Sequence, residues 1–143
     1  MKHRIVALAL FVVILGTFIF SATASEVIEP RLNNTLTTST NFVISSTGKA
    51  TITETYNAYR QYFTSATVTS YIEKRTLGIF WTKVDIGEPN NTWVDTSTDF
   101  TNTIIHEVQL ESTGTYRATV TYEISGTGGA TDVIDYEQER TYS

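Results

Sequence analysis

The chain has 143 residues, no cysteine, ten basic and fifteen acidic side chains, and a formal net charge of −5 at neutral pH. Without cysteine, stability must come from burial alone and no disulfide contributes. The acidic balance disfavours nucleic acid and disfavours electrostatic adsorption to anionic lipid, because both attract basic surfaces. The length suits one domain with a sizeable core.

The N-terminus has the order of a secretory signal peptide. A basic stretch at residues 2–4 precedes an apolar run at 5–20, and the small residues Ala22 and Ala24 follow. This order predicts cleavage after residue 24. The alternative is a retained anchor, but a run of 16 residues is shorter than the ~20 needed to span a bilayer. Cleavage would leave 119 residues with a net charge of −7, and we expect an extracellular protein without stable membrane insertion.

Short β-patterned runs follow a polar segment at 25–40, which we expect to be a flexible lead. The runs lie at 41–46, 49–56, 66–75, 79–86, 92–94, 101–110, 114–125 and 130–141. Thr76-Leu77-Gly78 predicts a hairpin turn in which glycine supplies a positive φ. Seven to eight strands at this spacing predict a sandwich or barrel.

The segment 112–122 carries the most specific pattern. Its alternation places Tyr116, Ala118, Val120 and Tyr122 on one face of a strand. Gly114, two residues before Tyr116, makes the segment similar to the tyrosine corner of immunoglobulin-like sandwiches. The resemblance implies an all-β, immunoglobulin-like antiparallel sandwich over residues 41–143.

In that fold, residues 47–53 and 113–121 would be strands B and F, which face each other across the core. Trp81 is a candidate core tryptophan, although an antibody-type tryptophan belongs on strand C, which we assign to 66–75. The chain also resembles uncharacterised small secreted proteins of Gram-positive bacteria. That resemblance implies location and fold and brings no known activity with it.

Residues for catalysis are scarce, and we expect a protein that is not an enzyme. His106 is the only histidine outside the predicted signal peptide, and no serine lies in a nucleophile elbow. Paired carboxylates for glycoside hydrolysis remain an alternative, because four glutamates lie on predicted strands: Glu54, Glu73, Glu107 and Glu123. Each fits an exposed strand position or an edge.

Loop residues with oxygen ligands raise calcium as a further alternative. They are Asp85, Glu88, Asn90, Asp95, Asp99, Asp132 and Asp135. No EF-hand spacing is present, so we expect them to be solvated, and we predict no metal and no cofactor. Threonine repeats resemble ice-matching arrays, but their β-propensity explains them better.

A group of aromatic residues is the best candidate for a binding surface. Its members are Tyr59, Tyr62, Phe63, Trp81 and Trp93. Aromatic rings stack on sugars and anchor protein interfaces; the alternative is that these rings cap one end of the sandwich. The leading hypothesis is a secreted, non-enzymatic binding module for a protein or an envelope glycan. A small secreted toxin or antimicrobial factor is the alternative, and a hydrolase comes third.

Overall fold

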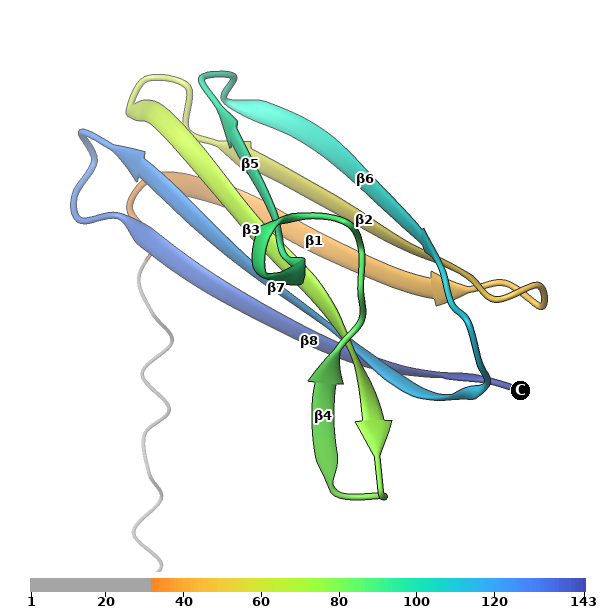
Figure 1. The fold of residues 1–143 in the computed structure, drawn as a ribbon. Helices are drawn as coiled ribbons and strands as arrows, with labels where there is room; N and C mark the ends of the chain where they lie inside the picture. The colour runs from red at the N-terminus through yellow and green to blue at the C-terminus, as the bar shows by residue number, and fades with distance from the viewer. Residues whose placement is uncertain (1–31) are drawn as a thin grey trace, which may run out of the picture. The chain divides into compact units, whose positions relative to one another are not determined.

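The structure is a computed structural model that describes residues 32–143 (Figure 1). The predicted signal peptide at 1–24 and the start of the predicted lead lie outside these residues. The described part holds eight strands and one 3-10 turn, η1 (Pro89–Asn91). The strands are β1 (Thr35–Ile44), β2 (Lys49–Ala58), β3 (Phe63–Thr76), β4 (Phe80–Lys83), β5 (Trp93–Ser97), β6 (Thr101–Gln109), β7 (Gly114–Gly126) and β8 (Asp132–Tyr142).

The strands form two antiparallel sheets, which confirms the predicted all-β sandwich. One sheet has the order β1-β2-β6, and the other has the order β4-β3-β7-β8 with β5 also paired to β3. β4 and β5 follow one another along the same edge of β3, β5 beside its first half and β4 beside its last residues.

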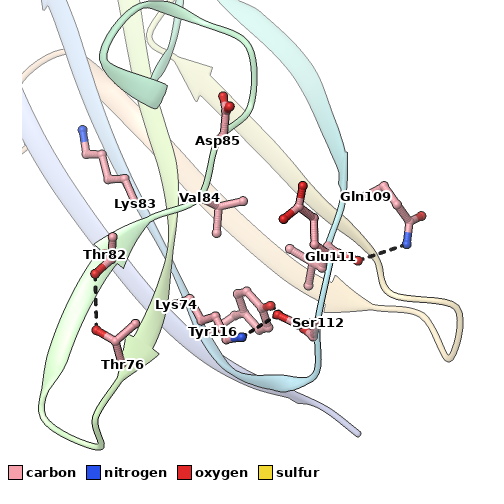
Figure 2. A pocket seen from close by; sticks show the side chains of 11 residues that line it. Lys74, Thr76, Thr82, Lys83, Val84, Asp85, Gln109, Glu111, Ser112 and Tyr116 are labelled. Carbon is pink, nitrogen blue, oxygen red and sulfur yellow. Dashed lines mark hydrogen bonds between the residues drawn. The ribbon is translucent and has the colours of Figure 1, made fainter.

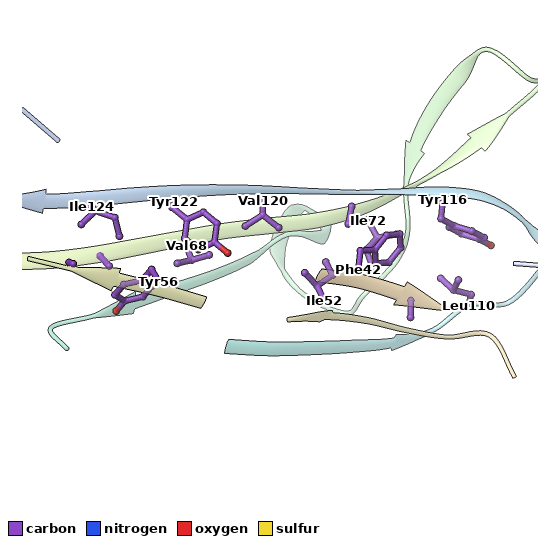
Figure 3. Packing of buried hydrophobic residues seen from close by; sticks show 14 residues of the cluster. Phe42, Ile52, Tyr56, Val68, Ile72, Leu110, Tyr116, Val120, Tyr122 and Ile124 are labelled. Carbon is purple, nitrogen blue, oxygen red and sulfur yellow. The ribbon is translucent and has the colours of Figure 1, made fainter. Parts of the chain in front are cut away.

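Strict alternation builds the core between the sheets (Figure 3). On β2 the residues facing inward are Ala50, Ile52, Glu54 and Tyr56, and threonines occupy the outer positions between them. Figure 3 shows the labelled rings and aliphatic chains between the two layers of strands. The buried hydrophobic residues are Phe42, Ala50, Ile52, Tyr56, Ala58, Ala66, Val68, Ile72, Leu110, Tyr116, Ala118, Val120, Tyr122 and Ile124.

Side chains from the second sheet hold the edge of β1. Gln138 accepts a hydrogen bond from the Phe42 amide at 3.0 Å and donates to the Thr40 carbonyl at 2.8 Å. Tyr122 donates to the Ser39 carbonyl at 2.7 Å. An exposed strand edge is a template for unwanted pairing, and here the amide of Gln138 occupies part of it.

The prediction of a flexible lead through residue 40 is wrong from Thr35 onward, because β1 begins there. The Asp132 carboxylate accepts hydrogen bonds from the amides of Asn33, Asn34 and Thr35 at 2.7–2.8 Å, and from the Thr35 hydroxyl at 2.8 Å. Asp132 is only 4% exposed. Polar composition hid the start of this strand from sequence reasoning, since the carboxylate that binds its first residues lies almost a hundred residues away.

Tyr116 makes the contact expected of a tyrosine corner: its ring is buried and its hydroxyl donates to the Ser112 carbonyl. Trp81 does not occupy the core, which corrects that expectation. It lies on β4, part of a hairpin that projects beyond the sandwich in Figure 1, and it is only partly buried.

Candidate functional site

The β3–β4 hairpin ends in a turn with an unusual residue at its apex. Leu77 has φ 51° and Gly78 has φ 74°, and the Ile79 amide donates to the Thr76 carbonyl at 3.2 Å. Positive φ at both central residues defines a type I′ turn, which favours Asn-Gly. Leucine in this conformation costs roughly 1–2 kcal/mol. The turn therefore holds an apolar side chain where local energetics favour a polar one.

The tip of this hairpin is the most exposed apolar group of the described residues. Leu77 is 89% exposed, Ile79 is 73% exposed and Phe80 is 58% exposed. All three lie within four residues of one another, in or next to the β3–β4 turn, and this turn is the end of the projection in Figure 1. Scattered exposed hydrophobic residues are ordinary, whereas contiguous exposed apolar groups are typical of interaction sites.

Cations and an indole ring lie directly behind the tip. Arg75 pairs with Trp81 across the hairpin, and its guanidinium lies 4.7 Å from the centre of the indole. The Arg117 guanidinium lies 4.3 Å from the same ring. Hydrogen bonds from Arg117 to Glu73 raise the pKa of the Arg117 guanidinium. The Trp81 indole thus lies within cation–π distance of two guanidinium groups.

A small pocket of about 220 Å³ lies beside the base of the hairpin (Figure 2). Val84, Leu110 and Tyr116 contribute its apolar lining, and Lys74 lies over the Tyr116 ring at 5.7 Å. Lys74 also donates to the Ser112 hydroxyl at 2.6 Å. The volume is below the ~300 Å³ at which ligand pockets usually begin. The pocket suits one side chain better than a substrate.

The structure does not bring the five predicted aromatic residues together. Tyr59 and Tyr62 pack edge to face in the β2–β3 turn, and Phe63 begins β3 against the core. Trp81 lies beside the last residues of β3, opposite Arg75, about 40 Å from Phe63 along a strand that rises ~3.3 Å per residue. Trp93 lies on β5 between them. The predicted group is three separate places, and sequence reasoning missed Leu77, Ile79 and Phe80.

A polar cluster joins the two sheets near Trp93. His106 Nε2 lies 2.8 Å from Asp95 Oδ2 and 3.9 Å from Glu54 Oε2. The imidazole stacks on the Trp93 ring with centroids 4.6 Å apart. Because His106 belongs to β6 and Asp95 to β5, this contact links the sheets along the edge opposite β8. The imidazole and the Asp95 carboxylate share one hydrogen bond across the two sheets.

Glu54 is buried, so the expectation of an exposed or edge position is wrong for this glutamate. Burial raises the pKa of its carboxyl, and the Ser70 hydroxyl and His106 offset part of that rise. Among residues 32–143, neither carboxylate oxygen of Glu54 nor the Ser70 hydroxyl has a formed hydrogen bond, so Ser70 and His106 act on Glu54 as neighbours and not as bonded partners. The alternation of β2 already placed Glu54 among the inward-facing residues, which was the available signal.

Several of the acidic residues considered for calcium accept separate hydrogen bonds. Asp132 accepts backbone hydrogen bonds, Asp135 accepts from the Thr121 hydroxyl at 2.6 Å, and Asp85 accepts from the Gly87 amide at 3.1 Å. Within residues 32–143 there is no group of three or more histidine or acidic side chains arranged to hold a metal ion.

The same described range has no helix long and apolar enough to cross a membrane. No protein-family model matches the chain, and no curated protein or solved structure matches it either. The function is therefore argued from the hairpin, the pocket beside it and the polar cluster.

Proposed function

We propose that this chain is an exported, non-enzymatic binding module that attaches to a component of the cell envelope through the tip of its β3–β4 hairpin. The observation that carries the proposal is the exposure of Leu77, Ile79 and Phe80 together at one protruding point. These side chains add nothing to the core of the domain, and water around them costs free energy that a partner would recover.

The turn supports the same proposal. Leu77 holds a left-handed conformation that asparagine or glycine would adopt with less strain, so its side chain adds a cost to the isolated domain. Binding surfaces commonly lie on loops that a rigid scaffold presents. Here β3 is the scaffold: its earlier residues pair with β5 and β7 inside the sandwich, and its last residues carry the hairpin outward.

The test uses the purified protein and envelopes isolated from the organism that encodes it. We expect the protein to sediment with the envelopes. The double variant Leu77→Asn, Ile79→Thr should stay in solution, because it replaces apolar contacts with polar groups. Asparagine suits the type I′ turn and threonine suits a strand, so the variant is expected to fold.

Val133→Thr is the matched control, because Val133 is 54% exposed on β8 at the other end of the sheet from the hairpin. This variant should sediment like the parent protein. Equal sedimentation of the double variant and the parent would show that another surface binds. A parent protein that remains entirely soluble would overturn the proposal.

A further inference from the structure

We infer that the component bound by the hairpin tip is the surface of a phospholipid bilayer that contains anionic lipid. This inference rests on the proposed function and names its partner. The tip would lie in the interface of the bilayer and would not span it.

The order of side chains along the hairpin matches the order of layers in a membrane interface. Leu77 is at the apex, Phe80 is one level behind it opposite Thr76, and Trp81 with Arg75 forms the next level. At ~3.3 Å per residue, the apolar tip reaches about 7–10 Å beyond the indole. Interfacial segments bury their apolar side about 5–10 Å deep, and indole rings concentrate at the headgroup level.

The hairpin itself carries a local excess of cations, which an anionic surface attracts. Residues 74–83 contain three cations, Lys74, Arg75 and Lys83, and no carboxylate. Carboxylates do lie around the base of the hairpin: Glu73 and Glu137 pair with Arg117, Glu139 pairs with Arg75, and Asp85 and Glu111 line the pocket there. The net charge of −5 for the whole chain does not reveal this local group of cations. Lys74 and Lys83 donate to uncharged groups, the hydroxyls of Ser112 and Thr92, and neither forms an ion pair within residues 32–143.

Arg75 is paired with Glu139 at 3.4 Å, and both side chains are substantially exposed. Exposed pairs of this kind contribute little and exchange readily for another anion. A lipid phosphate can therefore take the place of Glu139 beside Arg75. The indole of Trp81 stays against the same guanidinium in either case.

The small size of the tip favours lipid over a protein or a glycan. A stable protein interface uses about 20–30 residues on each side, and the apolar tip offers three. A glycan needs polar partners, and the side chains of Leu77, Ile79 and Phe80 have none. A bilayer requires neither a large nor a complementary surface, because its hydrocarbon adapts to what enters it.

The test measures binding of the purified protein to sedimenting vesicles. One vesicle contains phosphatidylcholine alone and the other an equal mixture with phosphatidylglycerol. We expect binding to the mixed vesicles. The double variant Leu77→Asn, Ile79→Thr should lose more than about tenfold in affinity. Lys74→Gln should lose up to about fivefold on the mixed vesicles and little on phosphatidylcholine. Ile105→Thr, which changes a residue 60% exposed on β6, is the matched control and should bind like the parent.

Trp81 gives a second readout that does not depend on sedimentation. In a Trp93→Phe background Trp81 is the only indole, because the chain has two tryptophans. We expect its emission to move to shorter wavelength with mixed vesicles and to be quenched by brominated lipid chains. Emission unchanged by the vesicles would contradict the inference.

Three outcomes separate the two proposals. Failure of the parent protein to bind mixed vesicles while it still sediments with whole envelopes would show a protein or glycan partner: the lipid inference would be wrong and the proposed function would stand. Binding to neither would overturn both. Binding to vesicles that survives unchanged in the double variant would show that the hairpin tip is not the contact.

Discussion

Asp132 offers the sharpest test of how the domain is held together, through the substitution Asp132→Asn. Its carboxylate accepts four hydrogen bonds, three from the amides of Asn33, Asn34 and Thr35 and one from the Thr35 hydroxyl. Asparagine has nearly the same shape. However, the amide oxygen of asparagine, placed where Oδ2 was, keeps three of these hydrogen bonds only as neutral ones. Its NH2 group then faces the Asn33 amide, so two donors meet and that hydrogen bond is lost.

The expected magnitude follows from that loss. Hydrogen bonds to a charged group contribute about 1.5–3 kcal/mol and neutral ones about 1 kcal/mol, so we expect the free energy of unfolding to fall by about 3 kcal/mol. With a urea m-value near ~2 kcal/mol/M for a domain of this size, the midpoint should fall by about 1.5 M. Asp135→Asn is the control. Asp135 is exposed on the same strand and accepts one hydroxyl hydrogen bond, and its loss should cost less than about 1 kcal/mol.

The pH dependence of stability gives an independent test, because its direction follows from the pKa shift of Asp132. Burial alone would raise the pKa of Asp132, but the hydrogen bonds from Asn33, Asn34 and Thr35 outweigh it and the pKa is lowered. A lowered pKa adds stability that is present above the unfolded value near ~3.9 and is lost as pH falls through the folded value. The difference between parent and Asp132→Asn should therefore shrink in acid. A difference below about 0.5 kcal/mol at neutral pH, or one that stays constant into strong acid, would refute the account.

Three further predictions concern the core and the loops. Tyr116→Phe removes the hydroxyl that donates to the Ser112 carbonyl and should lower the free energy of unfolding by about 1 kcal/mol; a variant that melts no earlier than its parent would show that the corner does not stabilise the fold. Glu54→Gln should flatten the pH dependence of stability. Burial raises the pKa of Glu54 in the folded protein, so the parent loses stability as pH rises from the unfolded-state pKa through the folded-state pKa. If the stability of parent and variant changes in parallel from mildly acidic to alkaline pH, this account is contradicted. Gly126→Ala places a Cβ 2.2 Å from the Tyr62 carbonyl oxygen and should destabilise the domain by about 1–3 kcal/mol or more, measured as a lower urea midpoint; an unchanged midpoint would mean that the β2–β3 turn moves freely.

Much of the fold could be predicted because alternation records which face of a strand is buried. The inward residues of β2 and β7 were readable from spacing alone, and so was the β3–β4 turn at Leu77-Gly78. The start of β1 could not be read, because its polar residues are fixed by Asp132 from the far end of the chain. Local composition carries no record of such a partner.

The features of the candidate site also fall into those that the sequence predicts and those that only the tertiary structure decides. Sequence alone determined two layers of strands and a turn between β3 and β4, since each follows from side-chain period and turn chemistry. The same period placed Glu54 on the inward face of β2, although we expected an exposed or edge position for this glutamate. Only the tertiary structure decided that Trp81 leaves the core with a projecting hairpin and that His106 meets Asp95. The physical reason is that exposure and contact between strands depend on pairing register and on where neighbouring strands end, which is long-range geometry that no short window of residues contains.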